Sequence, residues 1–169
     1  MKSLRPLLLL PLAAVAAQAY TLELELGRNH PTGGKDGSVV GLTSAWQLNE
    51  SFGLGLNLNS RDLTNTTSAL DTTARTALLE LTYDLNSRGG IRPFIGAGVG
   101  YSWLSGDTTA SKSVMATDVF AGVRFALSEN LELSLAVKNS EFIGVKSANG
   151  LTKKTVNDWS HSVGLRLKF

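Results

Sequence analysis

Cysteine is absent from the 169-residue sequence, and histidine occurs only at His30 and His161. Without cysteine, a chain of this size has to be stable without disulfide bonds. Two histidines that lack the spacing of metal ligands do not make a zinc site. We therefore expect no metal site and no cofactor.

The sequence also lacks a hydrophobic run of the roughly 20 residues that a membrane-spanning helix needs. The apolar run at 7–17 follows two basic residues and closes on Ala17-Gln18-Ala19. A charged start, an apolar centre and a small-x-small end are the parts of a secretory signal peptide, and the run is short for a retained anchor. We expect residues 1–19 to be a signal peptide cleaved after Ala19, and residues 20–169 to form the mature domain.

Neither sign of charge dominates once the signal peptide is removed. The chain has 16 basic and 14 acidic residues, so the loss of Lys2 and Arg5 leaves 14 of each. A neutral chain has no electrostatic footprint for nucleic acid. The length after residue 19 fits a single domain.

What the sequence does contain is alternation of apolar and polar residues, the pattern of a strand whose two faces meet different surroundings. In the clearest segment, 52–60, phenylalanine and leucine at even positions alternate with glycine and asparagine at odd positions. Each predicted strand is close to or above the roughly 9 to 11 residues of a tilted membrane strand. The predicted strands are 20–28, 38–48, 52–60, 73–85, 91–103, 114–127, 131–139 and 156–169.

Short and long connections alternate between these segments. The tight turns are predicted at 49–51, 86–90 and 128–130, and the long polar loops at 29–37, 61–72, 104–113 and 140–155. Short turns on one side and longer loops on the other are typical of outer-membrane barrels. The sequence therefore predicts an all-β fold: an eight-stranded antiparallel up-and-down transmembrane β-barrel with short periplasmic turns and four longer extracellular loops.

Aromatic residues gather at the two ends of the apolar face, as expected for rings that favour a lipid–water interface. The girdle near the short turns would contain Tyr20, Trp46, Phe52, Tyr83, Phe125 and Phe169, and the girdle near the long loops Tyr101, Trp103 and Trp159. Phe94 and Phe120 fall on the polar face and Phe142 in a loop. The alternative is a soluble lipocalin-like barrel whose edge aromatics cap an apolar core.

The polar face combines glycines with charged residues. Gly96, Gly98 and Gly100 alternate along one strand, where missing side chains make room in a narrow interior. Because unpaired buried charge is costly, the charged groups should pair and fill the lumen. The predicted lumen network contains Glu23, Glu25, Glu80, Asp118, Arg124, Glu132, Lys138, Asp158 and Arg166, with Asp84, Arg92 and Lys168 on the same face.

Two strings of residues carry a family resemblance: RPFIGAGVGY at 92–101 and AGVRFALSENL at 121–131. They resemble the small bacterial outer-membrane β-barrel family that includes the OmpA transmembrane domain and OmpX. The resemblance implies a mid-barrel strand for the first string, and a strand with a tight periplasmic turn for the second. It also implies an outer-membrane location, and an assembly signal, read by the barrel-assembly machinery, at Val163, Leu165, Leu167 and Phe169.

The sequence favours a structural or surface-interaction role over catalysis. His161 falls on the apolar face while Ser160 and Ser162 fall on the polar face, so these neighbours do not form a Ser–His pair. His30, expected in the first long loop near Asp36, is the candidate for lipid A-modifying chemistry. We expect no catalytic residues, with a lipid A-modifying enzyme and a small channel as alternatives.

The loop side of the predicted barrel carries a surplus of basic residues. They are Arg28, Lys35, Arg61, Arg75, Lys112, Lys146, Lys153 and Lys154, against Asp36, Asp62, Asp71, Asp107 and Glu141. A mildly basic rim suits the phosphates of lipopolysaccharide. The expected partners of this monomer are therefore outer-membrane lipids, lipopolysaccharide and, during biogenesis, the barrel-assembly machinery, with no nucleic acid.

Overall fold

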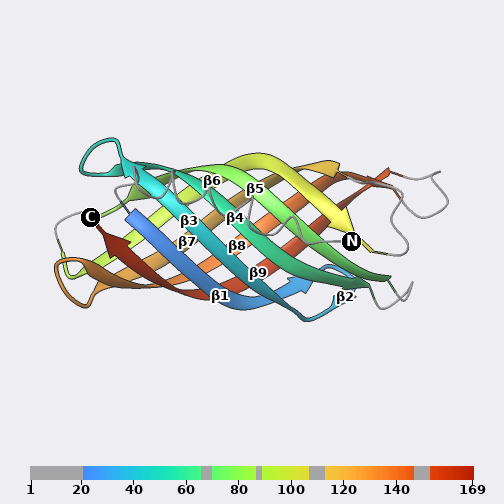
Figure 1. Cartoon of the computed structure of the whole chain (residues 1–169), viewed down its shortest axis with the longest axis horizontal. Helices are drawn as coiled ribbons and strands as arrows, with labels where there is room; N and C mark the ends of the chain where they lie inside the picture. Colours follow the sequence, from blue (N-terminus) through green and yellow to red (C-terminus); the bar gives the residue numbers. More distant parts are fainter. Residues whose placement is uncertain (1–20, 66–69, 87–88, 107–112, 147–152) are drawn as a thin grey trace, which may run out of the picture.

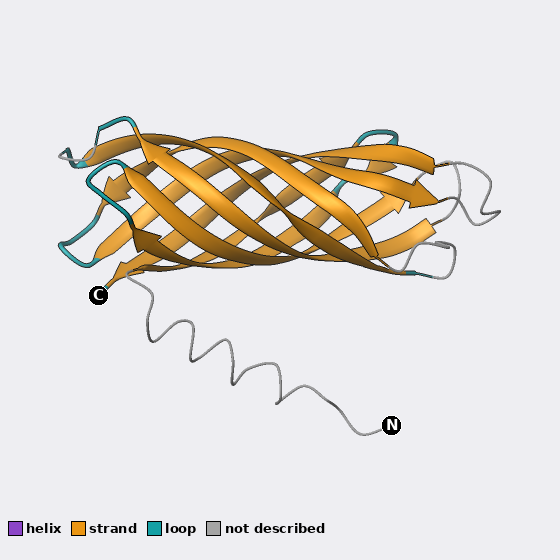
Figure 2. Cartoon of the chain, turned by 90° about the horizontal axis from the view of Figure 1, so that it is seen from above, coloured by secondary structure: helices purple, strands orange, loops and turns teal. Residues whose placement is uncertain are grey.

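The computed structural model describes residues 21–65, 70–86, 89–106, 113–146 and 153–169. Its strands are β1 (Thr21–Pro31), β2 (Gly34–Lys35), β3 (Gly37–Gln47), β4 (Phe52–Asn65), β5 (Leu70–Asp84), β6 (Ile91–Ser105), β7 (Ser113–Ala126), β8 (Leu131–Lys146) and β9 (Lys153–Lys168). The long strands pair in the order β4-β3-β1-β9-β8-β7-β6-β5, and pairing of β5 with β4 closes the ring. They wind obliquely around an elongated barrel (Figures 1 and 2). The predicted eight-stranded antiparallel barrel is confirmed.

The two ends of the barrel differ in the segments that join the strands. The turn end holds the turns 48–51 and 127–130, the end of β5, the start of β6, and the pair Thr21 and Lys168. The opposite end, which we call the loop end, holds the ends of β1, β4, β6 and β8 and the starts of β3, β5, β7 and β9. In one turn, the Asn49 side-chain oxygen accepts hydrogen bonds from the backbone N–H groups of Ser51 and Phe52, both at 2.9 Å. This Asx-type turn fixes the register of the β3–β4 hairpin.

Several strands continue further toward the loop end than the sequence pattern predicts. β4 ends at Asn65 rather than residue 60, β8 at Lys146 rather than residue 139, and β1 at Pro31, so that His30 lies in a strand and not in a loop. The short strand β2, which the sequence did not predict, pairs with Thr64 and Asn65. Beyond the lipid, both faces of a strand are polar, so the hydropathy alternation stops although the hydrogen-bonded ladder continues.

The barrel is polar inside and apolar outside. Among the described residues, 22 buried side chains are polar or charged and nine are hydrophobic, while large apolar side chains such as Leu79 and Val163 are about half exposed. A soluble lipocalin-like barrel would need the opposite arrangement, with an apolar interior. Within the described residues, no helix has the length and apolar character needed to cross a membrane.

A small apolar cluster lies inside the barrel toward the loop end. Phe142 is fully buried there and packs with Leu78, Leu104 and Val114. The prediction that Phe142 lies in a loop is therefore wrong. Phe142 follows the last clearly alternating residue of β8, so its inward orientation depends on three more residues of strand that the pattern did not reveal.

Candidate functional site

The lumen contains a hydrogen-bonded layer near the loop end, centred on Arg61. Its Nη1 lies 2.9 Å from Asp158 Oδ2 and donates to Ser140 Oγ at 2.8 Å, and its Nε donates to Asn59 at 3.2 Å. The guanidinium carbon lies 5.7 Å from the centre of the Phe142 ring. The Arg61 and Asp158 side chains are 1% and 0% exposed, so this ion pair is enclosed. The prediction that Arg61 belongs to the exposed rim is wrong, because Arg61 lies on the inward face of β4.

A second layer, in the middle of the lumen, is built around Lys138. Its Nζ lies 3.1 Å from Glu25 Oε2 and 3.4 Å from Glu80 Oε1. Ser162 donates a hydrogen bond to the other Glu25 oxygen at 2.5 Å. Asp118, on the neighbouring strand β7, is also buried, with 3% of its surface exposed. One ammonium group therefore bridges β1 and β5 across the barrel, which ties opposite walls together.

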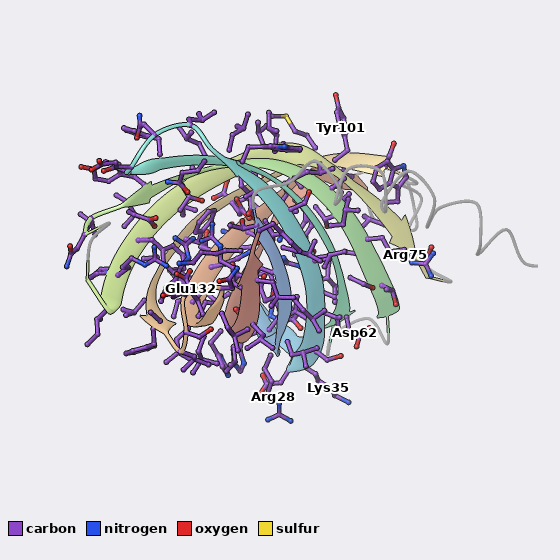
Figure 3. All side chains as sticks on the ribbon, turned by 60° about the vertical axis from the view of Figure 1, so that its left-hand side comes forward. Arg28, Lys35, Asp62, Arg75, Tyr101 and Glu132 are labelled. Carbon is purple, nitrogen blue, oxygen red and sulfur yellow. The ribbon has the colours of Figure 1, made fainter. Side chains whose placement is uncertain are left out.

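A third layer fills the turn end with arginine–carboxylate pairs. Arg124 Nη1 pairs with Asp84, and its guanidinium carbon lies 3.9 Å from the centre of the Phe94 ring. Glu132 is fully buried and pairs with both Arg92 and Lys168. Figure 3 shows Glu132 inside the barrel wall. These contacts satisfy charges that would otherwise be desolvated without a partner.

The remaining members of the predicted lumen set also lie at the turn end. Arg166 donates to Thr21 Oγ1 at 3.1 Å, and Ser134 donates to Glu23. The structure thus brings all nine predicted network residues to the inner face, in three layers. The partners could not be named from the sequence, because pairing depends on strand register.

Two glycines of the inner face lie opposite phenylalanines. Gly96 pairs with Phe120 and Gly122 pairs with Phe94 across β6 and β7. The two rings stand 6.2 Å apart at 61°, and Lys138 Nζ lies 5.2 Å from the Phe120 ring centre. Rings from one strand fill the space left by glycines of the other. A cavity beside them measures about 40 Å³, room for a few water molecules.

The predicted girdle aromatics with described side chains all lie on the outer face. At the turn end, the rings of Phe52 and Tyr83 are 4.9 Å apart, and Phe169 is 69% exposed. At the loop end, Tyr101, Trp103 and Trp159 are exposed; Figure 3 shows Tyr101 pointing away from the wall. Trp46 and Phe125 are partly buried on the same outer face, and Tyr20 lies outside the described residues. Val163, Leu165 and Leu167 also face outward from β9.

A polar cluster interrupts this apolar face near the loop end. His30 Nδ1 lies 2.7 Å from Asp36 Oδ1, and the His30 ring stacks on His161 with ring centres 5.1 Å apart. The sequence predicts His30 in a loop and His161 on the apolar face of the last strand; the pairing of β1 with β9 that closes the barrel brings the two rings together. The hydroxyl of Ser38, the register partner of Arg28, donates to Asp62 at 2.8 Å.

The loop half of the barrel retains part of the predicted basic surplus. Arg28, Lys35 and Arg75 point away from the wall in Figure 3, and Asp62 lies in the same region as Arg28 and Lys35. The side chains of Asp71, Asp107, Lys112, Lys146, Lys153 and Lys154 lie outside the described residues. No group of three or more His, Cys, Asp or Glu side chains in the described part of the chain is arranged to hold a metal ion.

A closed eight-stranded barrel with paired charges inside, apolar side chains outside and aromatic residues at both ends of that apolar face defines a transmembrane β-barrel. The family model of the outer membrane protein beta-barrel domain matches residues 5–169. The chain therefore belongs to this family of outer-membrane barrels.

Solved structures of outer-membrane barrels share the fold. Neisserial surface protein A (NspA) has 17% identity and a TM-score of 0.74, over 88% of this chain and 96% of that one. The N-terminal β-barrel domain of Pseudomonas aeruginosa OprF has 16% identity and a TM-score of 0.59, over 89% and 98%. The outer membrane enzyme PagL has 18% identity and a TM-score of 0.58, over 88% and 99%. Among curated proteins, none matches this sequence.

Proposed function

We propose that this outer-membrane barrel has a structural and surface-interaction role and is not an enzyme or an open channel. The observation that carries the proposal is the filled lumen: three layers of paired charge and two phenylalanines, with a cavity of about 40 Å³ beside the rings. A lumen occupied in this way should not conduct ions. The body of the barrel then acts as an anchor, and contact with other molecules falls to the loop end and the outer wall.

The test is a strain that lacks the protein, scored for envelope integrity, adhesion and outer-membrane permeability to large antibiotics. Loss of integrity or adhesion, restored by the wild-type chain, is the expected result. In planar bilayers, the purified barrel should give no steady conductance. A stable open current would contradict the filled lumen, and an unchanged envelope together with unchanged adhesion would contradict the role.

We propose that exposed basic side chains of the rim contact lipopolysaccharide phosphates. Lys35 and Arg75 are exposed, and Arg75 lies beside Trp103 in strand register, on the outer face of β5. Such exposed contacts are weak singly and are screened by salt. The double variant Lys35→Ala/Arg75→Ala should therefore restore envelope integrity less fully than wild type at low ionic strength, and as well as wild type at high ionic strength.

We also propose a route to the membrane: export by a signal peptide at residues 1–19, which lie outside the described residues, followed by insertion as a monomer through the barrel-assembly machinery. Amino-terminal sequencing of the protein recovered from the outer membrane should begin at Tyr20. A first residue at or before Ala19 would contradict cleavage after Ala19. Native mass spectrometry in detergent should give the mass of one chain.

Lipid A modification is the second candidate, and the His30–Asp36 contact is the observation in its favour. A hydrolase or acyltransferase also needs a nucleophile within hydrogen-bond reach of the histidine, and the hydroxyl of Ser38, the register partner of Arg28, is bonded to Asp62. The variant His30→Ala, compared with wild type in the same strain, should leave the lipid A mass spectrum unchanged. A changed spectrum would establish the enzymatic role instead.

A further inference from the structure

The outer wall of the barrel carries a hollow of about 390 Å³ that crosses four neighbouring strands, β7, β8, β9 and β1. Its two banks are rows of outward-facing residues in register across these strands. The row nearer the loop end is Ala121, Val137, His161 and Arg28, and the row nearer the turn end is Val123, Leu135, Val163 and Leu26. Between the rows run Gly122, Ala136, Ser162 and Gly27. We call this hollow the wall groove.

The floor of the wall groove is formed by positions that face the lumen, so it is mainly backbone: Gly122, Ala136, Ser162 and Gly27. On the outer face, Ala121 has only a methyl group, at the β7 end of the row nearer the loop end. The other outward residues of both rows are aliphatic except at the β9–β1 end. A long apolar chain that lies in such a groove replaces lipid contacts with a fixed wall and gains packing.

The β9–β1 end of the wall groove is polar. Arg28 and His161 pair across the two strands, and His30 stacks on His161 from the next outward position, with Trp159 as its register partner. Among the described residues, no ion pair includes Arg28. The nearby acids are already engaged: Asp36 contacts His30, and Asp62 accepts from Ser38.

The polar end also lies on the outer-leaflet side of the wall. In the row nearer the loop end, Ala121 lies five residues from the turn end of β7, and Arg28 lies seven residues from the turn end of β1. Seven residues at roughly 3.3 Å each, tilted by about 40°, place Arg28 about 18 Å above the turn end, within an apolar band about 25 Å tall. The turn end is the periplasmic end of this family's topology, so the wall groove rises toward the outer leaflet.

A guanidinium group on the lipid-facing wall is costly without an anion, although its stem can extend toward the interface. The wall groove thus has an apolar trough below and polar groups above: the Arg28 guanidinium, the two stacked imidazoles and Trp159. This arrangement matches a lipid whose acyl chain lies below its phosphate. We propose that the wall groove binds one molecule of lipid A, with an acyl chain between the two rows and a phosphate on Arg28 beside His161 and His30. This deepens the lipopolysaccharide contact proposed above and rests on it.

The test uses the full chain purified in detergent, with native mass spectrometry at physiological salt to count bound lipid. The probes are bisphosphorylated lipid A, chemically dephosphorylated lipid A and phosphatidylglycerol. Wild type should retain one bisphosphorylated lipid A per barrel, and Arg28→Ala should weaken that affinity at least about tenfold. Dephosphorylated lipid A should bind wild type and Arg28→Ala equally weakly.

Matched variants separate the wall groove from general surface effects. Ala121→Phe should weaken binding by filling the trough, whereas Ala97→Phe, an outward alanine on β6, should not. Arg75→Ala removes an exposed base on β5, outside the wall groove; a single exposed contact is weak and screened at physiological salt, so its loss of affinity should be well below that of Arg28→Ala. Heat-modifiable migration on gels checks that each variant is folded.

Equal losses for Arg28→Ala and Arg75→Ala would overturn the proposal in favour of diffuse surface charge. Phosphatidylglycerol bound as tightly as lipid A would overturn lipid A as the occupant. The envelope experiment fails independently of this one: an unaltered envelope with selective lipid A binding would reject the proposed role and keep the wall groove. Unselective binding with an altered envelope would reject the wall groove and keep the role.

Discussion

The ring of Phe120 occupies the space in which a side chain of its cross-strand partner Gly96 would lie. A Cβ atom built on Gly96 would stand 2.3 Å from Phe120 Cζ and 2.6 Å from the Leu81 backbone oxygen. The Phe120 ring cannot turn away freely, because the centre of the Phe94 ring lies 6.2 Å from its centre and Lys138 Nζ lies 5.2 Å from it. Glycine at 96 is therefore a packing requirement of the lumen.

Replacement of Gly96 by alanine should lower the free energy of unfolding by about 1–3 kcal/mol, the usual range for overpacking a filled interior. Urea unfolding in lipid vesicles, followed by tryptophan fluorescence, measures the change. The matched control is Gly90→Ala in a turn, where an added Cβ would meet no atom within 4 Å. Equal stabilities for the two variants would show that the Phe120 ring has room to move.

The Arg61–Asp158 ion pair predicts a strongly non-additive double-mutant cycle. Arg61→Met leaves the Asp158 carboxylate buried without its cation, which should cost about 3–5 kcal/mol of unfolding free energy. Adding Asp158→Asn should recover much of that loss, because the buried charge is then gone. Arg75→Met, on the exposed outer face, should change the free energy by less than about 0.5 kcal/mol. Additive single and double variants would contradict the enclosed pair.

Phe142 and its neighbour Ile143 provide a test of the β8 extension. Phe142 is fully buried and Ile143 is 42% exposed on the opposite face. Phe142→Ala should destabilise the barrel by about 3–5 kcal/mol through the cavity it leaves. Ile143→Ala should have an effect within about 0.5 kcal/mol. The reverse order of effects in urea unfolding would mean that the strand is shifted by one residue.

Phe169 separates an assembly signal from an interfacial anchor. Deletion of Phe169 should reduce the amount of heat-modifiable, folded barrel in the outer membrane, while refolding of the purified chain into vesicles stays near wild type. Phe125→Ala removes another aromatic of the same girdle and should affect both assays alike. If the deletion of Phe169 reduces folding in the outer membrane and refolding into vesicles to the same extent, Phe169 is only an interfacial anchor.

The fold was predictable from the sequence because the bilayer imposes a strict period on the strands that cross it. Leu54, Leu56 and Leu58 must face lipid, so the inward positions of β4 follow from counting. Above the bilayer this constraint ends. For that reason Arg61 was expected on the rim and Phe142 in a loop, although the strand ladder carries both side chains into the lumen.

Sequence patterns could not predict which side chains pair across the barrel. Lys138 bridges Glu25 and Glu80 at separations of 113 and 58 residues, and these contacts depend on closure of the ring and on register. His30 and His161 meet for the same reason. A usable signal did exist: in a closed eight-stranded barrel the first and last strands pair, and both histidines fall on the outer face at similar distances from the turn end.

Ser162 shows how thin the barrel wall is beneath the wall groove. Its hydroxyl bonds to Glu25 in the interior, while its backbone forms part of the outer hollow. A methyl group added to Gly27 would press on the His161 carbonyl oxygen at 2.3 Å and on Ser162 Cβ at 2.8 Å. Only the backbone of the wall thus separates the lipid-facing His161 from the lumen-facing Glu25. Replacement of Gly27 by alanine would therefore disturb both the wall groove and the lumen.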